Sequence, residues 1–270
     1  NRATLAWDLE KFYDSIGIPN LVKAARHYEY PSTQLLLGLR CYLGPRVMTW
    51  QGTLSRWITP DTSINQGCVQ ANHMARMVVY RIIEKVFIAN PRAEVTQFVD
   101  DCTLSMRGAV KDLLAGVPIM AKAFATHCRL ARLGINWHKS CLNVADKKLG
   151  EALQLKIKLE TDMTIEVRKE IKVLGIDKSA GKRRGTTSAQ KREKAAKARM
   201  IRSRTLARAR KMAKVIFDKA ALPQVKYNKV VQGTTPTELK SIRRMAAASA
   251  QISAQGACAT TAIGITYGEK

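Results

Sequence analysis

The sequence predicts an α+β domain followed by a mainly helical one, with the boundary near residue 180. Segments with strand-like and helix-like apolar spacing alternate up to about residue 176, whereas only helical spacing follows. The composition also shifts after Gly181, because residues 182–214 hold 14 Lys and Arg but a single acid, Glu193. With 270 residues, each domain is long enough to bury a core of its own. We therefore assign residues 1–180 to the first domain and 181–270 to the second.

The N-terminal third of the chain predicts one strand, three helices and a hairpin. An apolar run at residues 4–9 is typical of a short buried strand. Gln51-Gly52 lies at the expected bend of a hairpin over residues 47–57. Helical spacing covers residues 14–30, 33–42 and 69–87.

From residue 94 onward, strands and helices alternate. Residues 94–106 predict two strands folded about Asp100-Asp101, and a helix follows over residues 110–131. Apolar and polar residues alternate over 153–167, which predicts a second hairpin with its turn at Thr161-Asp162. A short strand over residues 171–176 is expected next. Helix-forming residues then dominate residues 182–214 and 238–253.

The charge of the chain is its strongest bulk property. Lys and Arg number 46 and Asp and Glu 21, which gives a formal net charge of +25. Such an excess attracts polyanions, with nucleic acid as the first candidate and a membrane surface as the competitor. No apolar run approaches the ~20 residues of a membrane-spanning helix, and no signal peptide is visible. Six scattered cysteines without a CxxC pair indicate a reducing compartment.

Three aspartates at predicted strand ends suggest a metal site. Asp8 ends the first strand, and Asp100 and Asp101 lie at the turn of the hairpin. Neighbouring carboxylates repel each other, and a hard divalent ion such as magnesium relieves the repulsion. Two ions ~3.5–4 Å apart can hold both the attacking and the leaving oxygen of a phosphoryl transfer. Because Asp is also common in tight turns, the pair alone does not establish the site.

The surrounding residues supply the context. Five motifs occur in order: Asp8-Leu9-Glu10-Lys11-Phe12-Tyr13-Asp14, Asn65-Gln66-Gly67, Phe98-Val99-Asp100-Asp101, Leu133-Gly134-Ile135-Asn136 with Lys139-Ser140, and Val173-Leu174-Gly175-Ile176. They resemble motifs A to E of reverse transcriptases, most of all those of non-LTR retrotransposons. Each motif is weak alone, but five in order form a specific pattern. The resemblance implies a right-hand polymerase palm, an antiparallel sheet packed on helices, followed by a mainly helical basic thumb.

The resemblance also implies a reaction and its ligands. An RNA-directed DNA polymerase within a retrotransposon polyprotein would transfer deoxynucleotides to a primer 3′-hydroxyl. Asp8, Asp100, Asp101 and the backbone carbonyl of Leu9 would hold two magnesium ions, with manganese as the alternative. The implied partners are an RNA template, a DNA primer, their RNA–DNA hybrid and deoxynucleoside triphosphates, with no membrane. Such elements act on chromosomal DNA, so we expect a location in the nucleus or cytoplasm.

Further residues receive roles from the same resemblance. Tyr13 would lie beneath the incoming sugar and exclude a 2′-hydroxyl, while Gln66 and Gly67 would line the nucleotide pocket. Lys139 would donate a proton to departing pyrophosphate or only pair with its phosphate, the alternative being a solvated surface lysine. The remaining residues would position the primer or contact the nucleic-acid backbone: Leu174 and Gly175 for the primer; Arg199, Arg202, Arg204, Arg208 and Lys211 for the backbone.

The chain departs from the family pattern in three places. Ala71-Asn72 stands where motif B usually continues with Ser-Pro, and Phe98-Val99 replaces the commoner Tyr-Ala of motif C. The fingers segment that precedes motif A in the family lies outside this sequence, which begins at Asn1, so we expect a longer protein. Group II intron and retron transcriptases share the motifs, and RNA-dependent RNA polymerases share the fold, although Tyr13 disfavours the last. The main alternative is a catalytically inactive or co-opted nucleic-acid-binding remnant of such an element.

Overall fold

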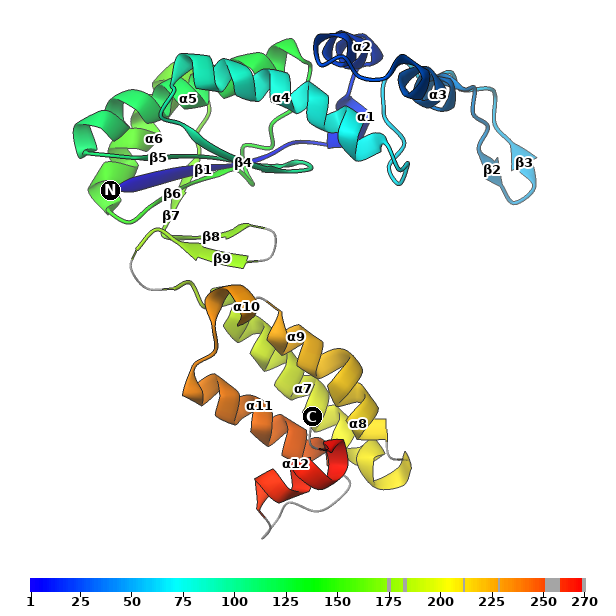
Figure 1. Cartoon of the computed structure of the whole chain (residues 1–270), viewed down its shortest axis with the longest axis vertical. Helices are drawn as coiled ribbons and strands as arrows, with labels where there is room; N and C mark the ends of the chain where they lie inside the picture. The colour runs from blue at the N-terminus through cyan, green and yellow to red at the C-terminus, as the bar shows by residue number, and fades with distance from the viewer. Residues whose placement is uncertain (174–175, 182–183, 211, 228, 251–257, 269–270) are drawn as a thin grey trace. The chain divides into compact units, whose positions relative to one another are not determined.

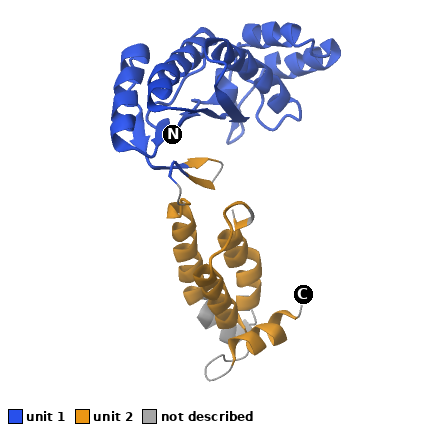
Figure 2. Cartoon of the chain, turned by 60° about the vertical axis from the view of Figure 1, so that its left-hand side comes forward, with its two compact units in different colours: residues 1–171, 179–182 blue, residues 172–178, 183–270 orange. Residues whose placement is uncertain are grey.

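The structure is a computed structural model of the chain. It describes residues 1–270 except 174–175, 182–183, 211, 228, 251–257 and 269–270. The side chains of residues 203–212 and 230 also lie outside the described part of the chain. The described chain divides into two compact units, which Figure 2 colours separately. Unit 1 comprises residues 1–171 and 179–182, and unit 2 comprises residues 172–178 and 183–270.

A five-stranded sheet forms the centre of unit 1, with strand order β4-β5-β1-β6-β7 (Figure 1). Its strands are β1 (Arg2–Asp8), β4 (Glu94–Phe98), β5 (Asp101–Arg107), β6 (Cys141–Val144) and β7 (Glu166–Arg168). All pairings are antiparallel except that of β6 with β7. β1 occupies the middle position because alternate side chains, Ala3, Leu5 and Trp7, are buried to 1–2% exposure.

Helices cover one face of this sheet. Unit 1 contains α1 (Phe12–Ser15), α2 (Ile18–His27), α3 (Ser32–Leu43), α4 (Ala71–Ala89), α5 (Val110–Leu130) and α6 (Lys147–Thr161). Figure 1 shows α4 and α5 along the same side of the strands. Trp7 of β1 stacks on Phe124 of α5 with ring centroids 5.3 Å apart, which joins sheet and helix in one apolar core.

A short hairpin follows α3 and carries exposed apolar side chains. Its strands are β2 (Thr49–Trp50) and β3 (Thr53–Leu54), joined by Gln51 and Gly52 at positive φ. The hairpin expected from the sequence is confirmed. Trp50 and Leu54 are 76% and 68% exposed.

The hairpin predicted over residues 153–167 is wrong, because most of this segment is helix α6. Leu149, Leu153 and Ile157 recur every four residues and are almost fully buried, whereas Leu155 and Leu159 are 60% and 75% exposed. The Asp146 carboxylate caps the helix by accepting a hydrogen bond from the Lys148 amide at 2.9 Å. The helical face therefore decides the structure, and the apparent alternation came from exposed leucines.

Two other segments differ from the sequence prediction. The single helix expected over residues 14–30 is two helices, because the chain is extended at Ile16 and Gly17 before α2 begins, with Pro19 in its first turn. The single strand expected over 171–176 is two paired strands, β8 (Glu170–Val173) and β9 (Ile176–Ser179). Pro118 lies inside α5.

Unit 2 is helical after β9. It contains α7 (Thr187–Arg210), α8 (Met212–Ile216), the π-helical turn η1 (Phe217–Ala221), α9 (Leu222–Lys226), α10 (Lys229–Gln232), α11 (Pro236–Ser249) and α12 (Ala259–Tyr267). A small core of its own includes Met200, Phe217 and Met245. The expected α+β fold with a basic helical part after it is confirmed. Within the described residues, no helix combines the length and the apolar character that a bilayer crossing requires.

Candidate active site

The predicted carboxylates come from two adjacent strands of the sheet. Asp8 is the last residue of β1 and pairs in register with Asp101, the first residue of β5. Asp100 precedes it in the turn from β4, next to Val99 at φ 55°. A β-branched residue rarely adopts this conformation, so the turn that carries the two aspartates is a strained one. The side-chain amide of Gln97 supports the turn, because its Nε2 donates a hydrogen bond to the Val99 backbone carbonyl at 3.1 Å.

The charges of these aspartates interact with each other. Burial raises the pKa of Asp101, and the negative charges of Asp100 and then Asp8 raise it further. The charge of Asp100 also reaches Tyr13: burial raises the pKa of this phenol first, and Asp100 adds to the effect. The three carboxylates and Tyr13 therefore share one electrostatic environment.

The Asp8 end of β1 is fixed by the segment that follows α5. The Asn136 amide donates to the Asp8 carbonyl at 2.8 Å, and the Asp8 amide donates to Ser140 Oγ at 3.2 Å. This arrangement brings Lys139 Nζ to 3.8 Å from Asp8 Oδ2. Lys139 is 69% exposed, so the ion pair is weak by itself. The motif D residues thus lie beside motif A.

The donor set suits a hard divalent ion in its chemistry, because it consists of neighbouring carboxylates whose charges repel one another. The side chains do not converge, however. Among the described residues, no three His, Cys, Asp or Glu side chains are grouped closely enough to hold a metal ion. Leu9 has a buried side chain and can contribute only its backbone carbonyl.

Tyr13 lies where the segments after β1 and before α4 meet. Its carbonyl accepts a hydrogen bond from the Ile64 amide at 2.9 Å, and its hydroxyl donates to Asn72 Oδ1. Gly67 adopts φ +95° with open space around it, a conformation that favours glycine. Gln66 is exposed beside it.

The remaining predicted residues are only partly described. Leu174, Gly175 and Lys211 lie outside the described residues. Arg204 and Arg208 belong to α7, but their side chains also lie outside them. Arg199 and Arg202 are exposed on α7, and Arg199 donates a hydrogen bond to Gln224 Oε1 at 3.0 Å.

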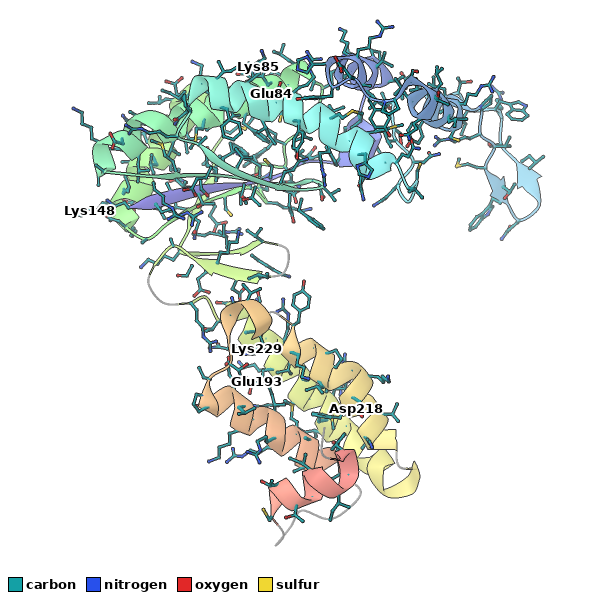
Figure 3. The ribbon with its side chains drawn as sticks, in the orientation of Figure 1. Glu84, Lys85, Lys148, Glu193, Asp218 and Lys229 are labelled. Atoms are coloured by element: carbon teal, nitrogen blue, oxygen red, sulfur yellow. The ribbon has the colours of Figure 1, made fainter. Side chains whose placement is uncertain are left out.

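Sequence reasoning gave no role to two features that the structure brings forward. The first is Asn72, visible in the sequence only as a departure from the Ser-Pro of motif B. The second is an ion cluster in unit 2: Arg184 and Lys229 contact the Glu238 carboxylate at 2.9 and 2.7 Å. Figure 3 labels Lys229 on α10. No local sequence motif predicts this cluster, because its members lie up to 54 residues apart in the sequence.

The fold is that of a polymerase palm with a helical part after it. The profile of the family described as "Reverse transcriptase (RNA-dependent DNA polymerase)" matches residues 1–177, more than half of the chain. The chain therefore belongs to the reverse transcriptase family, whose members are nucleotidyltransferases.

Solved structures of telomerase are similar to the chain. Apo telomerase from Candida tropicalis has a TM-score of 0.51 at 10% identity, over 98% of this chain and 43% of that one. Telomerase from Candida albicans, in complex with a TWJ fragment of telomeric RNA, has a TM-score of 0.43 at 8% identity, over 100% of this chain and 48% of that one. The chain thus spans less than half the length of either protein. A search of curated proteins gave no match.

Proposed function

We propose that this chain is the palm and thumb of a reverse transcriptase that extends a DNA primer on an RNA template. Membership of the family supports the reaction class. The single observation that carries the assignment to this site is the pairing of Asp8 with Asp101, beside Asp100, at the end of two adjacent strands. The motif resemblance further suggests a non-LTR retrotransposon as the source, with residues 1–180 as palm and 181–270 as thumb.

The carboxylates would hold two magnesium ions, or manganese, together with the carbonyl of Leu9. When bound, the ions would stabilise negative charge on the transferring phosphate. Binding of the ions would require the three side chains to lie closer together than they do here. Lys139, now next to Asp8, would then be free to donate a proton to the departing pyrophosphate.

Other residues of the chain would bind and select the substrate. Tyr13 would lie under the sugar and exclude a 2′-hydroxyl, and Gln66 with Gly67 would line the nucleotide pocket. Leu174 and Gly175 would position the primer. The cations Arg199, Arg202, Arg204, Arg208 and Lys211 would contact phosphates of the RNA–DNA hybrid without reading sequence. A fingers segment of the same polyprotein would complete the triphosphate site, and the complete protein would act in the nucleus or cytoplasm.

Primer extension on an RNA template tests this proposal. The chain, joined to the fingers segment of its complete protein, is assayed with magnesium or manganese beside the Asp100→Ala, Asp101→Ala double variant. We expect deoxynucleotide incorporation by the wild type and none by the variant. The double variant Glu151→Ala, Glu160→Ala is a matched control, since both carboxylates are exposed on α6, away from the site, and form only surface ion pairs.

The same experiment separates the second candidate function, a nucleic-acid-binding remnant. In that case neither protein would incorporate nucleotides, and both would bind RNA or DNA with the steep salt dependence of phosphate contacts. The net charge of +25 is the observation that supports this alternative. That outcome would contradict the enzymatic proposal.

A further inference from the structure

Tyr13 is held from two directions by the segment that leads into α4. Its backbone carbonyl accepts the Ile64 amide at 2.9 Å, and Ile64 is completely buried. Its hydroxyl donates to Asn72 Oδ1. One contact fixes the backbone, and the other fixes the far end of the ring, so the phenol has little freedom to swing.

Asn72 is a firm anchor because α4 is rooted in the core on both sides of it. Ala71 and Met74 are 2% and 0% exposed, while Asn72 itself is exposed. Gln70, the residue immediately before α4, accepts a hydrogen bond from the Tyr30 hydroxyl at 3.3 Å. The first turn of the helix therefore holds the Asn72 amide at a defined place.

The contact involves a residue at which this chain departs from the motif B pattern. In the motif B pattern that the sequence resembles, the position of Asn72 is proline, which has no side-chain acceptor. A tyrosine facing proline would keep its ring in place by van der Waals contact alone. Here a directed hydrogen bond is added, and the charge of Asp100 lies within reach of the same phenol.

We propose that Asn72 is a positioning residue that fixes the ring of Tyr13 and so sets how strongly the site prefers deoxynucleotides to ribonucleotides. The inference rests on the proposed function and on the role of Tyr13 within it. Asn72 does not touch the substrate in this account. It acts through Tyr13, because a ring that can tilt away leaves room for a 2′-hydroxyl.

The test is a double-mutant cycle in the primer-extension assay. For wild type, Asn72→Ala, Tyr13→Phe and the double variant, kcat/KM is measured for a deoxynucleotide and for the matching ribonucleotide. Tyr13→Phe keeps the ring and removes only the hydroxyl. We expect each single variant to lower the ratio of the two values roughly 3- to 10-fold, as the loss of one hydrogen bond predicts. In Asn72→Ala the change should come mainly from faster ribonucleotide use, and the double variant should lower the ratio no further than either single variant.

His73→Ala is the matched control, since His73 is the next residue of α4 and is also exposed. A wild-type ratio in Asn72→Ala would overturn the inference while leaving the polymerase proposal intact. So would an equal loss for both nucleotides, which is what a general weakening of the fold produces, or fully additive effects in the double variant. A wild type that incorporates nothing would contradict the proposed function itself, and the role of Asn72 with it.

Discussion

Two groups of carboxylates in this protein lie in opposite electrostatic surroundings. At the strand ends of unit 1, burial and then the charges of Asp100 and Asp8 raise the pKa of Asp101. In unit 2, burial also opposes the charged form of Glu238, but hydrogen bonds outweigh it and lower the pKa to about 2. Those bonds come from Lys229, the Thr235 amide and Arg184.

The contrast separates a structural role from a functional one. Glu238 is satisfied by two cations and closes a capping box with Thr235 at the start of α11, so its charge supports the fold. Asp101 has neighbours of its own sign, so its charge opposes the fold in the absence of a cation. In a chain with 46 basic residues, a carboxyl whose pKa is raised by two neighbouring acids supports the metal site proposed for these strand ends.

The largest effect on activity should follow from neutralising one of the three aspartates at the strand ends of unit 1. Asp101→Asn keeps the shape of the side chain and removes its charge. We expect primer extension to fall by about 10³-fold or more, because charge stabilisation at the phosphate is lost. The free energy of unfolding should not decrease, since repulsion is relieved. A variant that keeps its activity, or that unfolds more easily than wild type, would break the contrast.

Glu238→Gln should have the reverse profile. It leaves Arg184 and Lys229 without their carboxylate in a partly buried place. We expect a loss of about 1–3 kcal/mol in the free energy of unfolding, measured by urea denaturation. Glu151→Gln is the matched control, because its pair with Lys147 is exposed. Equal stabilities of the two variants would show that the Glu238 cluster contributes little.

The pH dependence of stability should follow the lowered pKa of Glu238. A depressed pKa means that the contribution is present above the ordinary value of 4.5 and is lost as pH falls towards about 2. The difference in unfolding free energy between wild type and Glu238→Gln should therefore be constant near pH 6 and shrink through this window. Denaturation curves at pH 6, 4 and 3 measure it, and a difference independent of pH would contradict the assignment.

A divalent ion should stabilise unit 1 by binding to Asp8, Asp100 and Asp101. At ten times its dissociation constant, magnesium should add about 1.4 kcal/mol to the unfolding free energy of the wild type. The Asp100→Ala, Asp101→Ala variant should gain less. Thermal unfolding with magnesium, and with an equal ionic strength of sodium, measures the difference. The same shift in both proteins would show that the ion binds elsewhere.

The smallest effect should come from the ion pair between Lys139 and Asp8. Because Lys139 is largely exposed, Lys139→Ala should change the unfolding free energy by less than about 0.5 kcal/mol. If Lys139 donates the proton, incorporation should fall in the variant. Lys147→Ala, which removes another exposed lysine, should alter neither quantity.

Much of the fold followed from the sequence because local patterns and tertiary contacts agree there. The strand before Asp8 and the hairpin at Asp100-Asp101 carry turn and strand signals that burial then satisfies. The prediction for residues 153–167 was wrong because Leu155 and Leu159 complete an alternating pattern that is typical of a strand. Only the burial of Leu153 and Ile157 in the structure reveals the helical face. Periodicity alone cannot distinguish an exposed leucine from a core leucine.

Part of the candidate site could likewise be predicted from the sequence, and part depends on tertiary contacts. Motif order selected Asp8, Asp101 and Tyr13, and the register of β1 with β5 explains why the two aspartates are adjacent. The sequence could not reveal that Asn72 faces Tyr13, because the contact depends on how α4 enters the core after residue 64. Nor could it show how the carboxylate side chains lie relative to one another, since a motif encodes residue types and not side-chain positions.

Iron-mediated cleavage of the chain tests the central claim most directly, because it does not depend on activity. Ferrous iron replaces magnesium, and ascorbate with peroxide then cuts the backbone next to the bound ion. We expect breaks close to residues 8 and 100, suppressed by excess magnesium and absent from the Asp100→Ala, Asp101→Ala variant. Breaks spread along the chain, or the same breaks in both proteins, would contradict a metal site at these carboxylates.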